Sequence, residues 1–148
     1  TGYFKLNRGD ELISGMILDS CFIIKGSITC QRAAMMRDYY LYLWGLPMKL
    51  MDANTLLQPT VKYQKIKGIA YFTIQVNYPK DTWMFYFSKE DYSLKAYQFI
   101  KHDQTGELIE LEGLINIGKM KIPKNRKWFT LPEQKHIATD ILIKTANY

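Results

Sequence analysis

The segment Trp83-Met84-Phe85-Tyr86-Phe87 decides the fold class of this chain. Trp83, Phe85 and Phe87 occupy alternate positions, and alternate residues of a β-strand point to the same face of a sheet. Ten aromatic residues fall between Tyr71 and Phe99, a stretch that reads as three consecutive strands. One face of the expected sheet therefore carries several large rings. This is more apolar bulk than a thin sheet needs, and it indicates a curved sheet that encloses something apolar.

From residue 60 onward the sequence has the pattern of consecutive antiparallel hairpins. Runs rich in β-branched and aromatic residues alternate with turn signals such as Lys67-Gly68 and Gly118-Lys119. A spacing of about 8 to 12 residues between strands is typical of a meander, a sandwich or a barrel. We expect a break at Pro123-Lys124-Asn125. The expected strands cover residues 61–66, 69–78, 82–88, 94–101, 107–117, a short strand that ends at 122, then 126–131 and 136–145.

Residues 31–44 form the one convincing helix that the sequence predicts. They are rich in good helix formers, and Gly45 followed by Leu46-Pro47 ends the helix. Aromatic side chains, Tyr40 and Trp44 among them, recur at helical spacing, so we expect the sheet to cover much of this helix. Residues 3–29 are predicted to be strands. The triplet Arg8-Gly9-Asp10 is explained by local turn chemistry more simply than by an adhesion motif.

The predicted fold is therefore mainly β with one main helix, in the α+β class. A curved antiparallel meander forms an incomplete barrel around the helix at about 31–45, within a single domain that covers residues 1–148. The length of 148 residues, with 47% hydrophobic and 23% charged residues, fits one globular domain. No apolar run approaches the roughly 20 residues that a membrane-spanning helix needs. The chain begins at Thr1 without a signal segment, so we expect a mature form or a fragment.

The net charge of +6 is concentrated in one region. Much of the excess comes from Lys119, Lys121, Lys124, Arg126 and Lys127. A basic cluster of this kind can meet nucleic acid or anionic lipid. The more common explanation is the solvated side of a hairpin, which the sequence favours. Because no nucleic-acid-binding motif accompanies the cluster, we expect no nucleic-acid partner.

Two cysteines, Cys21 and Cys30, allow two interpretations. They close a short segment as a disulfide in an oxidising compartment, or they remain reduced and buried. Their spacing matches no zinc or redox motif. We expect reduced, buried thiols, with the disulfide as the alternative.

No motif in the sequence points to catalysis, to a metal centre or to a cofactor. There is no Gly-x-Ser-x-Gly segment and no glycine-rich phosphate loop, and His102 and His136 lie in polar stretches at strand ends. Metal binding needs three or four converging ligands, whereas the candidate ligands are scattered. Glu110 and Glu112 could form a glycosidase pair, although the same spacing fits the solvent side of a strand. We expect a non-enzymatic protein without cofactor or metal.

Three blocks of sequence resemble an uncharacterised family of secreted or lipid-anchored bacterial proteins. They are residues 39–50 (YYLYLWGLPMKL) with Asp52, residues 80–83 (KDTW) with 85–87 (FYF), and residues 122–128 (IPKNRKW). That group is similar in fold to the periplasmic lipoprotein carriers and outer-membrane lipoprotein receptors, whose antiparallel sheet curls into an incomplete barrel lidded by helices. The resemblance covers about residues 31–143. It implies a periplasmic or outer-membrane-associated location and no particular activity.

The chain departs from that family before the helix. Members of the group have more sheet there, whereas about 30 residues precede the helix in this sequence. A chain that lacks part of the N-terminal sheet would expose apolar surface. It could then pair along a strand edge to form a homodimer.

The leading functional hypothesis is a non-enzymatic binding module of the bacterial cell envelope. It would hold a lipid, an acyl chain or a lipoprotein in an apolar cleft between sheet and helix, and it could associate peripherally with a membrane. The alternative is a structural or interaction protein of the envelope whose rings fill a solid core, and an enzyme with an unrecognised site comes third. The expected ligand-lining residues are Trp83, Phe85, Phe87, Tyr97, Phe99, Tyr40 and Trp44.

Overall fold

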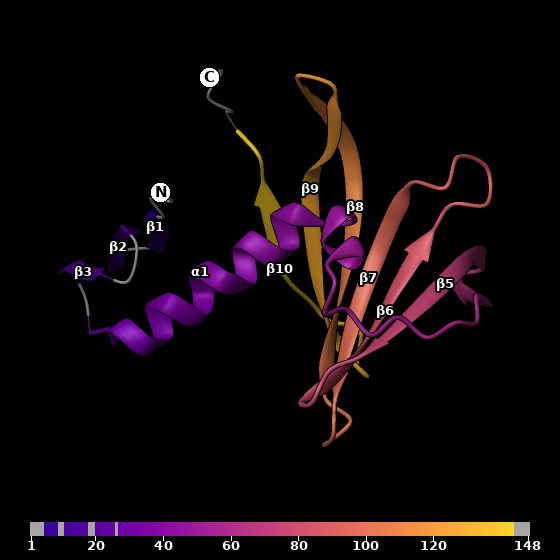
Figure 1. Cartoon of the computed structure of the whole chain (residues 1–148), viewed down its shortest axis with the longest axis horizontal. Coiled ribbons are helices and arrows are strands. Elements are labelled where there is room, and N and C mark those ends of the chain that lie inside the picture. Colours follow the sequence, from indigo (N-terminus) through magenta and orange to yellow (C-terminus); the bar gives the residue numbers. More distant parts are fainter. Residues whose placement is uncertain (1–4, 9–10, 18–19, 26, 144–148) are drawn as a thin grey trace. The chain divides into compact units, whose positions relative to one another are not determined.

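The structure, a computed structural model, describes residues 5–8, 11–17, 20–25 and 27–143. The described part contains one α-helix, one 3-10 helix and two antiparallel sheets (Figure 1). The predicted class, mainly β with one main helix, is confirmed. The chain divides into two compact units, Thr1–Asp52 and Ala53–Tyr148, and each is described by itself. The single domain expected from the sequence stays a prediction.

The first unit begins with a three-stranded sheet in the order β1-β2-β3. Its strands are β1 (Lys5–Arg8), β2 (Glu11–Ile17) and β3 (Ser20–Lys25). Helix α1 (Cys30–Gly45) and the 3-10 helix η1 (Met48–Met51) follow. The strands expected within residues 3–29 are thus confirmed in outline. The turn at Arg8-Gly9-Asp10 includes residues outside the described part of the chain.

Helix α1 has a well-defined beginning and end. Thr29 is the N-cap, and its hydroxyl oxygen accepts a hydrogen bond of 3.2 Å from the backbone N–H of Arg32. Leu43 is buried, whereas Tyr40 and Trp44 are half-buried. Within the described residues, no helix is long and apolar enough to cross a membrane. We expected the main sheet to cover much of this helix. The helix and that sheet belong to two units that are described separately, so this contact stays a prediction.

Cys21 on β3 and Cys30 at the start of α1 form a disulfide, with their Cα atoms 5.7 Å apart. This distance lies within the usual range for a disulfide. The expectation of reduced, buried thiols is therefore wrong. Cysteine is usually among the most buried residues, but Cys30 is exposed and Cys21 is half-buried. The bond links the last strand of the small sheet to the first turn of the helix.

The second unit is a seven-stranded antiparallel meander in the order β10-β9-β8-β7-β6-β5-β4 (Figure 1). Each strand pairs with its neighbours in sequence, as the turn spacing predicted. The strands are β4 (Lys62–Ile66), β5 (Ile69–Asn77), β6 (Asp81–Phe87), β7 (Leu94–Lys101), β8 (Gly106–Ile117), β9 (Met120–Leu131) and β10 (His136–Ile141).

The predicted break at residues 123–125 is wrong, because β9 runs through it as one strand. Pro123 lies opposite Leu114 of β8, and Asn125 lies opposite Glu112. Strand β10 pairs with β9 only as far as Asn125. Pro123 thus has a strand neighbour on one side only, and this is the position in a sheet where a residue without an N–H donor is tolerated.

The seven-stranded sheet is open and strongly curled. Lys67, in the turn after β4, and Glu110, on β8, would be separated by about 19 Å in a flat sheet, because three strands lie between. Instead the Lys67 Nζ lies 2.7 Å from a Glu110 carboxylate oxygen and 4.5 Å from the centre of the Phe129 ring. This confirms the predicted incomplete barrel. A small core fills the curl, formed by Tyr86, Ala96 and Leu108 with the partly buried Ile66, Tyr71, Met84, Phe129 and Leu131.

Candidate functional site

The rings predicted on alternate positions do share one face of the sheet. Trp83 of β6 lies opposite Phe99 of β7, and Phe85 lies opposite Tyr97. Residues directly opposite each other in an antiparallel pair point to the same face. The Trp83 ring centre lies 5.2 Å from that of Phe99, 5.9 Å from that of Phe85 and 6.0 Å from that of Tyr97. These four residues form a continuous aromatic layer.

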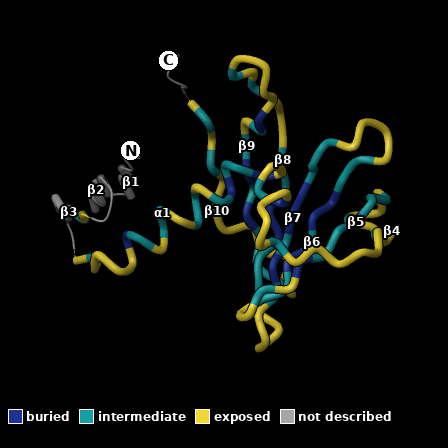
Figure 2. Tube along the Cα trace, in the orientation of Figure 1, coloured by how far each residue is buried: buried dark blue, intermediate teal, exposed yellow. Residues whose placement is uncertain are grey.

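This aromatic layer is buried. The exposed fraction is 6% for Trp83, 0% for Phe85, 1% for Tyr97 and 9% for Phe99. Strands β6 and β7 accordingly carry much of the buried chain in Figure 2. The indole N–H of Trp83 donates a 2.8 Å hydrogen bond to Asp81 Oδ1, so its polar atom has a partner. Such rings act as core, and the ligand-lining role expected for them stays a prediction.

The same face opens toward solvent at its β4 end. Tyr63 of β4 lies opposite Phe72 of β5, and Phe72 lies opposite Phe87 of β6, so one row of rings crosses three strands. Phe87 is the one expected lining residue that borders this opening, which we call the aromatic groove. The groove measures about 510 Å³ and is lined by Val61, Tyr63, Phe72, Ile74, Phe87 and Tyr92.

The walls of the aromatic groove are exposed rings. Tyr63 is 67% exposed and Tyr92 is 70% exposed. Both rings pack on Phe72, with ring centres 5.1 Å and 5.7 Å from it, and the Tyr92 ring is nearly parallel to the Phe72 ring. Lys89 Nζ lies 5.6 Å from the centre of the Tyr63 ring, a cation–π distance. The groove thus combines an aromatic surface with the Lys89 ammonium group at its rim.

A hydrogen-bonded turn holds Tyr92 in place. The Tyr92 N–H donates to the Ser88 carbonyl (3.1 Å), and the Ser88 N–H donates to the Ser93 carbonyl (2.9 Å). The Asp91 carboxylate accepts hydrogen bonds from the Ser93 hydroxyl (2.6 Å) and backbone N–H (3.1 Å). These bonds lower the pKa of Asp91 to about 2. Tyr92 itself has φ of 55°, in the left-handed region that non-glycine residues seldom adopt, so the turn fixes the ring in an unusual position.

Sequence reasoning missed five of the six groove residues. Tyr92 lies in a polar stretch that predicts only a turn. Tyr63 lies on the edge strand β4 and Val61 directly precedes that strand, in a segment with little apolar character. The usable signal was the alternation of Phe72 with Ile74, which puts both on one face of β5. Joining them to Tyr63 and Phe87 required the strand register, which the sequence does not contain.

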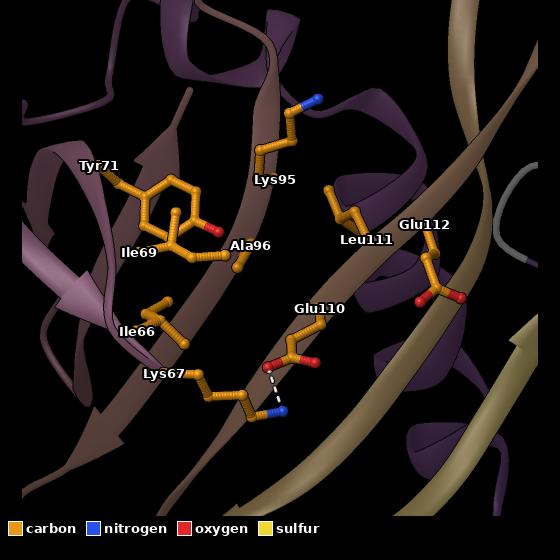
Figure 3. A pocket seen from close by; sticks show the side chains of 9 residues that line it. All are labelled: Ile66, Lys67, Ile69, Tyr71, Lys95, Ala96, Glu110, Leu111 and Glu112. Atoms are coloured by element: carbon orange, nitrogen blue, oxygen red, sulfur yellow. Dashed lines mark ion pairs between the residues drawn. The ribbon is translucent and has the colours of Figure 1, made fainter. Parts of the chain in front are cut away.

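A second, smaller pocket lies on the opposite face of the sheet, inside the curl. Figure 3 shows the Lys67–Glu110 ion pair joining the turn after β4 to β8, with the Lys95 ammonium directed away from it. The volume of about 210 Å³ is below the range usual for ligand pockets. The lining residues are Ile66, Lys67, Ile69, Tyr71, Lys95, Ala96, Glu110, Leu111 and Glu112.

The carboxylate pair in this pocket lacks the electrostatics of a glycosidase. Glu110 pairs with Lys67, and Glu112 accepts a 2.7 Å hydrogen bond from Lys127. That bond lowers the pKa of Glu112, whereas a general acid needs a raised pKa. Among the residues that the structure describes, no group of three or more His, Cys, Asp or Glu side chains could hold a metal ion.

Comparison with protein families shows which family the chain resembles over most of its length. Residues 13–145 match the family described as "Family of unknown function (DUF6503)". Comparisons with curated proteins and with solved structures give no match. The family match spans α1 and all strands of the seven-stranded sheet.

Proposed function

The chain belongs to the DUF6503 family of unknown function, and on this premise we propose that it is a non-enzymatic binding module that holds the hydrocarbon chain of a lipid in the aromatic groove. The ligand is an amphiphile whose acyl chain lies along Phe72, Ile74 and Phe87. Its anionic head lies at the rim, near Lys89. The ligand is apolar, as expected from the sequence. Its proposed site lies on the expected face of the sheet but closer to β4 than the buried rings of Trp83 and Phe85.

The observation that carries the proposal is a row of rings left open to solvent. Exposed apolar surface costs roughly 25 cal/mol per Å² relative to burial, so a groove walled by Tyr63 and Tyr92 gains free energy when hydrocarbon fills it. The groove volume of about 510 Å³ falls within the range of ligand pockets. The turn that fixes Tyr92 holds one wall in position before binding, which lowers the entropy cost of binding.

We further propose that the protein works in an oxidising compartment such as the bacterial periplasm. The Cys21–Cys30 disulfide supports this location, because disulfides persist in secreted and periplasmic proteins and are rare in the cytosol. The resemblance to secreted or lipid-anchored bacterial proteins points to the same compartment. A free lipid and the acyl chains of a lipoprotein offer the same hydrocarbon, and native mass spectrometry of the purified protein separates these two sources.

A titration with a fluorescent fatty acid in solution tests the groove. The variant Tyr63→Ser/Tyr92→Ser removes two exposed walls without touching the core. It should weaken binding at least about tenfold, since each lost ring contact is worth on the order of 1 kcal/mol. Ile137→Ser, an exposed apolar residue on the far edge strand β10, is the matched control and should bind like the wild type. Equal affinities for the wild type and for the double variant would refute the groove as the binding site.

A separate variant tests the proposed contact between Lys89 and the anionic head group. Lys89→Gln should weaken binding of a fatty acid and leave binding of the corresponding fatty alcohol unchanged, because only the acid carries a charge. If both ligands lose affinity equally, Lys89 acts through packing on Tyr63 and not through its charge.

A structural role is the second candidate, and the burial of the aromatic layer favours it. Phe85 and Tyr97 expose almost no surface, as expected for a solid core. In that case the protein would act through its surface, for example as a homodimer paired along edge strand β4 or β10. Lys62 and Lys65, exposed on β4, oppose such pairing at that edge. Native mass spectra that show the bare chain, alone or as a dimer, would favour this candidate over lipid binding.

A further inference from the structure

The β8–β9 hairpin extends beyond both of its neighbouring strands. Strand β7 pairs with β8 only as far as Ala96 opposite Glu110, and β10 pairs with β9 only as far as Ile141 opposite Asn125. The β8–β9 pairing continues to Ile117 opposite Met120. Residues 113–124 therefore form a two-stranded ribbon, which we call the basic ribbon. Figure 1 shows it reaching past the ends of the adjacent strands.

The basic ribbon carries positive charge that the described residues do not neutralise. Lys119, Lys121 and Lys124 are exposed, and none of them forms an ion pair with any of the residues that the structure describes. No Asp or Glu occurs between Glu112 and Glu133. The other two members of the basic cluster lie within the sheet, where Arg126 is buried and Lys127 pairs with Glu112.

Exposed apolar side chains accompany these lysines. Leu114 is 59% exposed and Met120 is 52% exposed. The end of β10 lies against the base of the ribbon, where the Leu142 N–H donates a 2.8 Å hydrogen bond to the Lys124 carbonyl. It adds Ile141 and Ile143, which are 57% and 91% exposed. Figure 2 shows the tip of this hairpin as mainly exposed. A hairpin that serves only solubility would not need this apolar surface.

We propose that the basic ribbon docks onto an anionic lipid surface. By the strand register, Leu114 lies on the same ribbon face as Lys121, whereas Met120 lies on the opposite face with Lys124. Ile141 lies opposite Asn125 and shares the face of Leu114. This face docks on the lipid, with Leu114 and Ile141 at the boundary between head groups and acyl chains and the lysine ammonium groups at the level of the lipid phosphates. Lysine suits this boundary because its stem is apolar and its charge stays in water. Combined apolar burial and electrostatic attraction is the usual basis of interfacial binding. This inference is independent of the aromatic groove.

The same charges could attract nucleic acid, but the apolar side chains favour lipid. Single-stranded nucleic acid is bound through aromatic side chains on which bases stack. The ribbon contains no aromatic residue between Gly113 and Lys124. Leu114 and Ile141 would gain nothing from a phosphate backbone, whereas each gains from contact with acyl chains.

Co-sedimentation with lipid vesicles tests the proposal. The full chain should bind vesicles of phosphatidylglycerol mixed with phosphatidylcholine, and it should bind phosphatidylcholine vesicles weakly. Each lysine near an anionic surface contributes about fivefold in affinity, so Lys119→Gln/Lys121→Gln/Lys124→Gln should weaken binding roughly 100-fold. Leu114→Ser/Ile141→Ser, which removes two exposed apolar side chains from one face, should weaken binding to both kinds of vesicle. Added salt should weaken binding of the wild type far more than binding of the triple variant.

The matched control removes three exposed lysines at the other end of the sheet. Successive turns of a meander alternate between its two ends, so the turns near Lys80, Lys101 and Lys135 lie opposite the ribbon tip. Lys80→Gln/Lys101→Gln/Lys135→Gln has the same net charge as the ribbon variant and should bind vesicles like the wild type.

Three results would overturn the proposal. The first is equal vesicle binding by the two triple variants, and the second is wild-type binding that does not depend on phosphatidylglycerol. The third is ribbon-dependent binding of RNA or DNA without vesicle binding. The fatty-acid titration contains no vesicles, so a negative result there leaves this inference unaffected, and the reverse also holds.

Discussion

The ammonium group of Lys67 lies 2.7 Å from the carboxylate of Glu110, although three strands separate the two residues along the sheet. The same nitrogen lies 4.5 Å from the centre of the Phe129 ring. Both charged side chains remain partly exposed, at 53% and 26%, so solvent screens their attraction. We therefore expect the apolar core inside the curl, and not this ion pair, to supply most of the stability.

A double-mutant cycle compares the contribution of the ion pair to stability with that of the apolar core. Lys67→Gln and Glu110→Gln should show a coupling free energy below about 1 kcal/mol, as expected for a partly exposed pair. Leu108→Ala, which removes a buried side chain from the small core, should cost about 2 to 5 kcal/mol. Urea unfolding of the four variants and of the wild type measures both quantities. A coupling energy larger than the cost of Leu108→Ala would show that the ion pair holds the curl.

Truncation of Phe85 tests whether the aromatic layer is core. Phe85→Ala should destabilise the fold by about 3 to 5 kcal/mol, because the ring is fully buried and leaves a cavity. Tyr63→Ala, on an exposed groove wall, should cost less than about 1 kcal/mol. Chemical denaturation monitored by tryptophan fluorescence gives both values. A small loss for Phe85→Ala would instead indicate an open cleft at this ring, as the sequence first suggested.

The face of each ring could be predicted from sequence, because alternation is a local property of a strand. Trp83, Phe85 and Phe87 share a face as expected, and α1 begins and ends within one residue of its predicted bounds. The open end of that face could not be predicted. It depends on which residue of β4 lies opposite Phe72, and that register is set by contacts distant in sequence.

Two errors have the same physical origin. The break expected at Pro123 assumed a neighbour on both sides of the strand, whereas β10 ends before it. The reduced thiols expected at Cys21 and Cys30 assumed burial, whereas the short segment between them brings the sulfur atoms together. In each case the intrinsic preference of the residue was correct, but its environment depends on another segment of the chain: strand β10 for Pro123, and strand β3 for Cys30.

Removal of the disulfide should destabilise α1 more than the seven-stranded sheet. In the chain-entropy account, closing a ten-residue loop contributes about 2 to 3 kcal/mol. Cys21→Ser/Cys30→Ser should therefore show faster amide hydrogen exchange in α1, with little change in β5–β9. The wild type with reductant should reproduce this pattern. If exchange in α1 is the same with and without reductant, the disulfide contributes little to the first unit.

The turn beside the aromatic groove should respond to acid. The Asp91 pKa is lowered to about 2, chiefly by hydrogen bonds from Ser93. A carboxyl group whose pKa is lower in the folded state stabilises the fold above its ordinary pKa. That contribution is lost as the pH falls from about 4 through about 2. We expect the Asp91–Ser93 bonds to weaken over this range, and the Tyr92 ring to leave Phe72.

Two-dimensional NMR follows this change through the Tyr92 ring protons, which the nearly parallel Phe72 ring shifts. Asp91→Asn should remove the pH dependence, because the amide does not titrate. Asp103, which accepts equivalent bonds from Thr105 in the turn after β7, is the matched control site. Asp103→Asn should leave the Tyr92 shifts and their pH dependence unchanged. A Tyr92 signal that is constant down to pH 2 in the wild type would show that the ring stays on Phe72 without the Asp91 carboxylate, and that ring stacking and the backbone hydrogen bonds of Ser88 and Tyr92 suffice to hold the groove wall.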